Sequence, residues 1–171
     1  MRPGCGFVAL LVVCCGFGIA IRADDEKKKE EPAKVELKEA TIDEIEKHVA
    51  AQKGKPTAMD VWATYCVPCR EKFPKFQALA VKHKEKASFF SLTIDDVEDA
   101  AKAKRFLESK KATFTNFLAK DGPEAVEKKF GFEGVPQYIL WLDGKIALKT
   151  DDIAKLEEKL KETLGAKKGD A

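Results

Sequence analysis

The sequence predicts one α/β domain in which helices cover both faces of a mixed β-sheet. Three observations predict this class. A chain of 171 residues is long enough for one domain with a substantial core. Short apolar runs alternate with amphipathic helical segments along most of the chain. Near the carboxyl end, Asp143-Gly144 separates two apolar runs, which is a strong signal for an antiparallel hairpin.

The amino-terminal 23 residues are expected to lie outside this domain. Arg2, an apolar run at 7–21 without acidic residues, and Ala23 before a charged stretch are typical of a secretory signal peptide cleaved after Ala23. The apolar run is short for a membrane span, and an uncleaved anchor through 7–21 is the alternative. Only in that case do we expect contact with a membrane. The segment predicts export to the periplasmic or extracellular side.

The folded domain is expected to span residues 35–164. Residues 24–34 are charged, poor in apolar side chains and interrupted by Pro32, which predicts a flexible linker. Residues 165–171 are expected to form a disordered tail. After removal of the leader, 29 basic residues face 29 acidic ones, and this balance does not favour nucleic acid as a partner.

The first elements follow from periodicity and chain breaks. An extended piece at 35–37 precedes a helix that a capping box of Thr41 and Glu44 begins. A break at 54–56 leads into a buried strand. The remaining elements of this half are a strand at 57–63, a helix at 66–83 that contains Pro74, and a strand at 87–95.

The second half continues the alternation of helices and strands. Ile153, Leu156, Leu160 and Leu164 recur at helical spacing and predict a closing helix from about Asp151. The elements before it are a helix at 97–111, a strand at 113–119, a helix at 123–131 and the hairpin at 136–149.

The number and spacing of the cysteines favour a chemically reactive pair over a set of structural disulfides. Of five cysteines, only Cys66 and Cys69 lie outside the leader. Exported domains that depend on disulfides usually carry several bridges. A bridge between residues this close closes a very short loop and stabilises a fold little.

The stretch "MDVWATYCVPCR" places this C-x-x-C pair between a strand and a helix. At the start of a helix, free backbone N–H groups and the helix dipole favour a thiolate at Cys66. Cys69, one turn later, is within reach to form a disulfide with it. Pro68 stiffens the first turn without wasting a hydrogen bond.

Two other uses of the cysteine pair are possible. A zinc site needs four ligands, and the only further candidates, His48 and His83, stand at unsuitable spacings. We expect both histidines on helix surfaces and no metal site. A purely structural disulfide is the second alternative.

Asp60 lies inside the apolar run of the strand at 57–63, six residues before Cys66. Burial should raise the pKa of its carboxyl, and a carboxyl that titrates nearer neutrality suits a proton acceptor for Cys69. The alternative is a carboxylate that is merely hydrogen-bonded to backbone or water.

Two segments resemble the thioredoxin superfamily: "VWATYCVPCREKFPKF" resembles its active-site segment, and "GFEGVPQYILWLDGKI" the loop before its hairpin. The resemblance implies a thioredoxin-like fold and a cis peptide at Val135-Pro136 beside the sulfurs. It implies a substrate-binding surface that includes Trp62, Tyr65, Val135 and Pro136. Tyr65 stands where Trp is commoner in the family.

The spacing is similar to that of the exported TlpA-like and ResA-like branch. Cys69 and Pro136 are 67 residues apart, about a helix and a strand more than in plain thioredoxin. We therefore expect an inserted helix-strand element at 97–119, and the resemblance covers residues 35–164. Asp60 matches the buried aspartate of the superfamily, although many TlpA-like relatives carry Asn there.

The resemblance implies an extracytoplasmic thiol-disulfide oxidoreductase without a cofactor. Cys66 would attack client disulfides and Cys69 would resolve the mixed disulfide. Val67-Pro68 has no histidine to stabilise the thiolate, which favours the reductive direction. The implied partners are client proteins with disulfides and a membrane thiol electron donor. The alternatives are a non-catalytic binding module with a fixed disulfide and a thiol peroxidase, against which the C-x-x-C pair argues.

Overall fold

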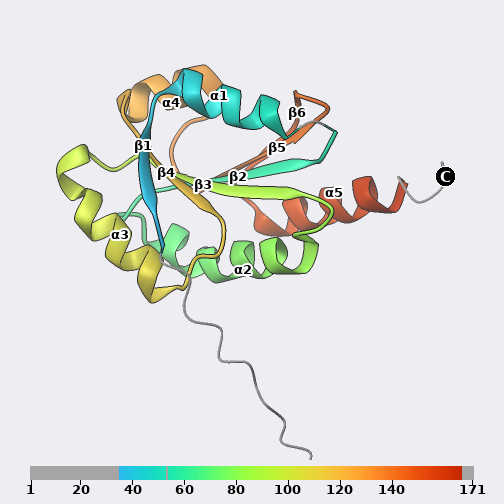
Figure 1. The fold of residues 1–171 in the computed structure, drawn as a ribbon, viewed down its shortest axis with the longest axis horizontal. Helices are drawn as coiled ribbons and strands as arrows, with labels where there is room; N and C mark the ends of the chain where they lie inside the picture. Colours follow the sequence, from blue (N-terminus) through green and yellow to red (C-terminus); the bar gives the residue numbers. More distant parts are fainter. Residues whose placement is uncertain (1–34, 53, 167–171) are drawn as a thin grey trace, which may run out of the picture. The chain divides into compact units, whose positions relative to one another are not determined.

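The computed structural model describes residues 35–52 and 54–166, and its α/β architecture with a mixed sheet confirms the expected class (Figure 1). The signal peptide and linker predicted from the sequence lie outside the described residues, as do residues 167–171 of the predicted tail. The described elements are β1 (Leu37–Ala40), α1 (Ile42–Ala51), β2 (Thr57–Trp62), α2 (Val67–His83), β3 (Ser88–Thr93), the 3₁₀ turn η1 (Val97–Asp99), α3 (Ala100–Ser109), β4 (Thr115–Ala119), α4 (Gly122–Phe130), β5 (Gln137–Leu142), β6 (Lys145–Thr150) and α5 (Ile153–Ala166).

The sheet has the strand order β1-β4-β3-β2-β5-β6. The first four strands in this order run parallel, and β5 and β6 form the antiparallel hairpin predicted around Asp143-Gly144. Strand β2 lies between a parallel and an antiparallel neighbour, and all its residues are buried. A central strand of this kind is covered by helices on both faces, which is why it reads as a nearly continuous apolar run.

Helices α1 and α4 cover one face of the sheet, and α2, α3 and α5 cover the other (Figure 1). Ring packing joins each layer to the sheet. On the α2 face, the ring of Trp62 lies 5.7 Å from that of Phe73 and 4.8 Å from that of Phe106 on α3. On the α1 face, the rings of Trp141 and Phe130 on α4 are 5.9 Å apart. Buried aromatic pairs of this kind supply much of the core energy of a domain.

The first strand lies later in the chain than expected. The extended piece was expected at 35–37, whereas β1 covers Leu37–Ala40 and pairs with β4 from Leu37 opposite Asn116 to Ala40 opposite Ala119. The position of an edge strand depends on its partner, and this partner is about 80 residues away. Local propensity could not identify it.

The predicted capping box is present at the start of α1. Thr41 Oγ1 accepts from the Glu44 N–H at 3.3 Å, and Glu44 Oε2 accepts from the Thr41 N–H at 2.8 Å. The Ile42 N–H donates to Asp121 Oδ2 just before α4, at 2.6 Å. The cap therefore also joins the two helices that cover this face.

The segment at 97–119 forms η1, α3 and β4, and β4 lies between β1 and β3 in the sheet. The expected helix and strand are therefore both present. That they form an insertion relative to plain thioredoxin stays a prediction. At the carboxyl end, α5 runs to Ala166 and so includes the first two residues assigned to the tail.

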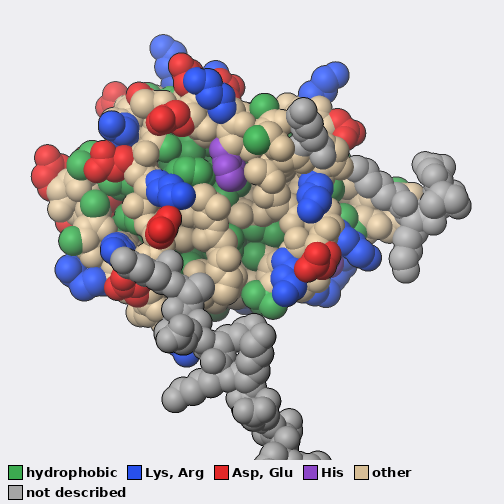
Figure 2. All heavy atoms as spheres, in the orientation of Figure 1, with side chains coloured by type: hydrophobic (Ala, Val, Ile, Leu, Met, Phe, Trp, Pro, Cys, Tyr) green, Lys and Arg blue, Asp and Glu red, His purple; other side chains and the backbone are tan. Residues whose placement is uncertain are grey.

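Acidic and basic side chains are interspersed over the face in Figure 2. One ion pair joins the two helices of the α1 face, with Lys129 Nζ 2.8 Å from Glu46 Oε2. Exposed pairs of this kind contribute only about 0–1 kcal/mol each. The apolar layers, and not the surface charges, stabilise the arrangement that positions the site.

Candidate active site

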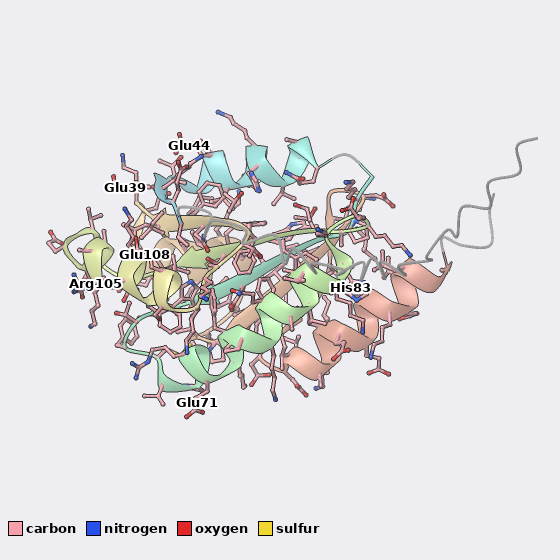
Figure 3. All side chains as sticks on the ribbon, turned by 60° about the horizontal axis from the view of Figure 1, so that its bottom comes forward. Glu39, Glu44, Glu71, His83, Arg105 and Glu108 are labelled. Atoms are coloured by element: carbon pink, nitrogen blue, oxygen red, sulfur yellow. A yellow bond between two sulfur atoms is a disulfide. The ribbon has the colours of Figure 1, made fainter. Side chains whose placement is uncertain are left out.

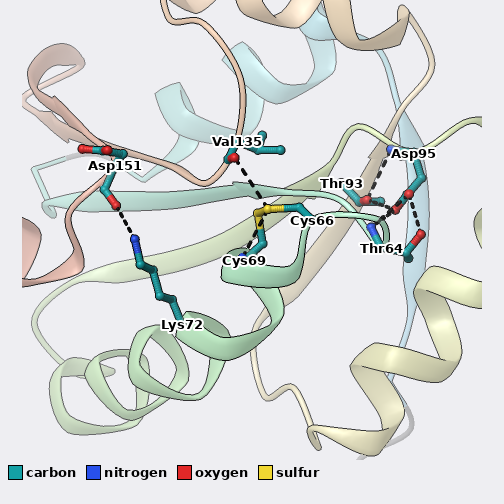
Figure 4. The surroundings of a disulfide bond; sticks show 8 residues. All are labelled: Thr64, Cys66, Cys69, Lys72, Thr93, Asp95, Val135 and Asp151. Atoms are coloured by element: carbon teal, nitrogen blue, oxygen red, sulfur yellow. Dashed lines mark hydrogen bonds between the residues drawn. A yellow bond between two sulfur atoms is a disulfide. The ribbon is translucent and has the colours of Figure 1, made fainter.

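The corner between β2 and α2 places Cys66 at the amino terminus of α2. Cys66 is the N-cap residue, with extended backbone angles, and its Sγ accepts a hydrogen bond from the Cys69 N–H at 3.2 Å (Figure 4). Pro68 occupies the first turn of the helix, where a missing N–H costs nothing. Because the N–H groups of the first turn point at the sulfur, this position stabilises negative charge on it.

A disulfide bond joins Cys66 and Cys69 (Figure 4). Cys66 is 8% exposed and Cys69 only 2%. Cys66 lines a surface groove, whereas Cys69 is not among the lining residues of that groove. A partner that enters the groove therefore reaches the sulfur of Cys66 first.

The loop before β5 passes directly beside this sulfur. The Val135 carbonyl oxygen lies 3.6 Å from Cys66 Sγ, and the Val135-Pro136 peptide bond is cis, as the resemblance implies. The Gly134 N–H donates to Glu127 Oε1 on α4 at 3.0 Å. Gly134 has a positive φ of 70°, a conformation that favours glycine. The carboxylate of Glu127 thus holds the loop against the sulfur.

An open groove of about 480 Å³ surrounds Cys66. Its walls include two strongly exposed apolar side chains, Tyr65 at 63% and Val67 at 51%. The other lining residues are Pro68, Ile94, Glu127, Gly134 and Val135. A groove with apolar walls and backbone groups next to a disulfide suits an extended polypeptide segment.

Two residues expected on the substrate-binding surface lie beneath it. The side chain of Trp62 is 0% exposed and packs against Phe73 and Phe106, so it does not lie on the surface of the groove. Pro136 is also buried and does not line the groove, where Val135 takes its place. Tyr65 and Val135 line the groove, and their contact with substrate stays a prediction.

Asp60 lies on the sheet face that α2 covers. Its neighbours Ala58 and Trp62, two residues away along β2, point to the same face, and Trp62 packs against Phe73 of α2. The Asp60 side chain is 1% exposed, and neither carboxyl oxygen has a hydrogen-bond partner among the described residues. Burial alone raises the pKa of Asp60 to about 8. Among the described residues no backbone group bonds to the Asp60 carboxyl, which removes the backbone half of the alternative of a carboxylate held by backbone or water.

Sequence reasoning missed Asp95, which holds the corner before Cys66. The Asp95 side chain is 2% exposed, and its carboxylate accepts bonds from the Thr64 N–H at 2.9 Å and from the Thr64 hydroxyl at 2.7 Å (Figure 4). It also accepts from the Thr93 hydroxyl. A signal existed, because Asp95 follows a buried strand at its carboxyl end, where polar residues of parallel sheets gather.

Glu127 was also missed. No pattern in the sequence distinguishes it from the other acids of its helix, and only the fold brings it to the loop at Gly134.

Neither histidine lies with the cysteines in a metal-binding group. His48 is half-buried, with its ring 4.9 Å from that of Phe90, so it is not the plain surface residue expected. Burial, with a smaller effect from Lys38, lowers the pKa of His48. His83 lies toward the far end of α2 (Figure 3). Among the described residues no group of three or more potential ligands could hold a metal ion, and no helix is both long and apolar enough to cross a membrane.

Comparisons with known proteins agree with the geometry of this site. The Redoxin family model matches residues 27–161. The thiol-disulfide oxidoreductase ResA of Bacillus thuringiensis subsp. konkukian is 28% identical over 148 residues, which cover 81% of this chain and 82% of ResA. The thioredoxin-like protein YneN of Bacillus subtilis is 30% identical over 74 residues, which cover 43% of this chain and 44% of YneN. The chain thus spans less than half the length of YneN.

Among solved structures, a protein named as the thiol:disulfide interchange protein DsbE of Chlorobium tepidum is 25% identical, with a TM-score of 0.59. The match covers 68% of this chain and 84% of that one.

Replacement of Asp95 by Ala should lower the free energy of unfolding by about 2–4 kcal/mol, because it leaves the buried Thr64 N–H without an acceptor. The matched control is Asp96→Ala, since Asp96 is exposed and its side chain caps no helix. That variant should change the free energy by less than about 0.5 kcal/mol. Urea unfolding of both variants measures the difference, and equal effects would contradict the assignment.

Asp60 should make the fold less stable as the pH rises. The unfolded carboxyl loses its proton near its ordinary pKa of 3.8, whereas the folded one keeps its proton up to about pH 8. Between these values the folded chain binds the extra proton, so a rise in pH favours unfolding until the effect is complete above about pH 8.

Asp60→Asn should remove this dependence. The variant should match the wild type near pH 4 and exceed its free energy of unfolding by on the order of a few kcal/mol at pH 8 and above. Urea unfolding between pH 4 and pH 9 is the measurement. A difference that does not grow with pH would mean that the carboxyl titrates normally.

Proposed function

The chain belongs to the Redoxin family, and we propose that it is a thiol-disulfide oxidoreductase that reduces disulfides of client proteins outside the cytoplasm. The observation that carries the proposal is the position of the Cys66–Cys69 disulfide, with Cys66 as the N-cap of α2 at the floor of an open groove. The TlpA/ResA-like character of the chain supports it.

The first step is an attack on the client. In the reduced protein, the Cys66 thiolate attacks one sulfur of a client disulfide. The client S–S bond breaks, a bond between Cys66 and the client forms, and the second client sulfur leaves as a thiolate. The contact between Cys66 Sγ and the Val135 carbonyl supports an extended client segment that lies beside this loop.

The second step regenerates the disulfide of the protein. Asp60 takes the proton of the Cys69 thiol, and the Cys69 thiolate attacks Cys66 Sγ. The mixed disulfide breaks, the client leaves with its second thiolate, and the Cys66–Cys69 bond forms. Two electrons have then passed from the protein to the client. Asp60 suits this role because it lies on the face covered by α2, and its pKa of about 8 lets it both accept and release a proton near neutral pH.

A reducing role requires an electron source outside the protein. We propose a membrane-embedded dithiol donor, which would reduce the Cys66–Cys69 bond by the same exchange in reverse. The signal peptide predicted at residues 1–23 supports an extracytoplasmic location. The reductive direction is supported by Val67-Pro68, which offers no histidine to stabilise the Cys66 thiolate.

Trapping tests the assignment of the two sulfurs. Cys69→Ser should accumulate mixed disulfides with a model disulfide protein, because the first bond forms but is not resolved. Cys66→Ser should trap nothing, and either change should lower insulin reduction by at least about 100-fold, because the described residues contain no third thiol to replace the lost one. In the reduced wild type, iodoacetamide near neutral pH should modify Cys66 first. Preferential labelling of Cys69, or trapping by Cys66→Ser, would refute the assignment.

A non-catalytic binding module is the competing function, and the same samples exclude or support it. A wild-type protein that reduces no insulin and whose disulfide has a reduction potential far below that of glutathione would support the module.

Asp60→Asn tests the base. The attack by Cys66 should keep its rate, while resolution by Cys69 should slow by at least about tenfold at pH 7, since proton transfer to a positioned base contributes roughly 100-fold or more. In the wild type the resolution rate should rise with pH up to about 8, and this rise should disappear in the variant. Stopped-flow reduction of a model disulfide separates the two steps. An unchanged resolution rate would make Asp60 a structural residue.

A further inference from the structure

A row of polar side chains crosses the interior of the sheet on the face that α2 and α5 cover. Residues in register on neighbouring strands point to the same face. The members of this polar row, in order from β4 to β6, are Asn116, Ser91, Asp60, Tyr138 and Thr150. Each is at most 9% exposed. Buried polar groups are nearly always hydrogen-bonded, so each member of this row is expected to have a hydrogen-bond partner.

The donors on one side of Asp60 are already used. The Ser91 hydroxyl donates to Asn116 Oδ1 at 2.9 Å, and Asn116 Nδ2 donates to the Phe114 carbonyl at 2.8 Å. On the other side, neither the Asp60 carboxyl oxygens nor the Tyr138 hydroxyl has a hydrogen-bond partner among the described residues. Two directly opposed residues therefore carry complementary groups, and neither group has a hydrogen-bond partner among the described residues, the other one included.

Among the described residues, no cation shifts the pKa of either member of this pair. The inward sides of α2 and α5 present apolar side chains and the disulfide, while Glu71 on α2 is exposed on the outer side of its helix (Figure 3). Burial is the cause that raises the pKa of Asp60. The pKa of Tyr138 is raised by burial first and then by the charges of Asp60, Asp152 and Asp151. The Tyr138 hydroxyl therefore keeps its proton and can act as a donor. The inward side chains in question are Cys69, Phe73, Phe76, Ile153, Leu156 and Leu160.

A second unpartnered donor lies on the same face. The Trp62 indole N–H has no partner among the described residues either, and Trp62 is two residues from Asp60 on β2. Its ring packs against the rings of Phe73 and Phe106. Tyr138 is favoured over Trp62 because it is the direct cross-strand partner of Asp60, and opposed residues of an antiparallel pair are the nearest neighbours on a sheet face.

We propose that the Tyr138 hydroxyl is the hydrogen-bond donor for the Asp60 carboxylate whenever Asp60 is ionised, and that it thereby decides how readily Asp60 takes the proton of Cys69. This inference rests on the proposed function, in which Asp60 is the base. Tyr138 touches neither the client nor the sulfurs in this scheme, so it is a positioning residue that acts through Asp60. Without its hydroxyl, the ionised carboxylate would lose its cross-strand donor, and its proton affinity would rise.

The test is Tyr138→Phe, which removes one hydroxyl and keeps the ring that stacks on Phe76. The titration midpoint of Asp60 is read from the ¹³C NMR shift of its carboxyl carbon in the oxidised protein, and the signal is assigned by its loss in Asp60→Asn. The midpoint should move upward by about one pH unit relative to the wild type, because the ionised carboxylate has lost a hydrogen-bond donor. Resolution of the mixed disulfide should slow by about tenfold at pH 7, because about tenfold less base is ionised.

Ser91→Ala is the matched control. It removes the hydroxyl on the other side of Asp60, whose donor already serves Asn116, so it should lower the melting temperature without moving the Asp60 midpoint. A purely structural Tyr138 would behave in the same way. An Asp60 midpoint that is unchanged or lower in Tyr138→Phe overturns the proposal. An Asp60 midpoint that rises in Trp62→Phe but not in Tyr138→Phe also overturns it.

The NMR titration uses no client and so separates this inference from the proposed function. An upward shift in a protein that reduces no disulfide would leave the pairing in place and refute the function. A protein that reduces disulfides with an unshifted midpoint would refute the pairing alone.

Discussion

The carboxylate of Asp95 holds the corner on which the reactive sulfur depends. Thr64 lies between the end of β2 and the start of α2, where its N–H has no strand or helix partner, and Asp95 accepts from both its N–H and its hydroxyl. Because Asp95 follows β3, this interaction ties the corner to a neighbouring strand instead of leaving it as a free loop. The first turn of α2, and with it the direction of its N–H groups toward Cys66, is set by that attachment.

The buried carboxyl of Asp60, unlike that of Asp95, has no hydrogen-bond partner among the described residues. A strand covered on both faces excludes water, which destabilises a charge and keeps the carboxyl protonated to an unusually high pH. That cost is concentrated at one position, directly across from the hydroxyl of Tyr138. The same exclusion of water that weakens the fold at high pH gives the carboxyl the proton affinity that a base for a thiol requires.

The groove around Cys66 is assembled from parts that are remote in the chain. Tyr65 and Val67 come from the corner itself, Ile94 follows β3, and Glu127 and Val135 come from α4 and the loop after it. Glu127 connects α4 to this loop, because its carboxylate accepts a hydrogen bond from the Gly134 N–H. The reactive pair is therefore local, whereas the surface that would select a client is a product of the whole fold.

The sequence alone determined the class of the fold, most elements and the chemistry of the pair, because these depend on near neighbours. Hydrophobic periodicity located the helices and the hairpin, and three-residue spacing placed Cys66 and Cys69 on one helical turn. Even the burial of Asp60 was readable from its apolar neighbours. The tertiary structure decided what depends on distant pairing. It moved the first strand to Leu37–Ala40 beside β4, buried Trp62 and Pro136 under the groove, and brought Asp95 to Thr64 and Glu127 to Gly134. The opposition of Asp60 and Tyr138 belongs to this second group, because strand register is set by contacts between residues 78 positions apart and not by either segment alone.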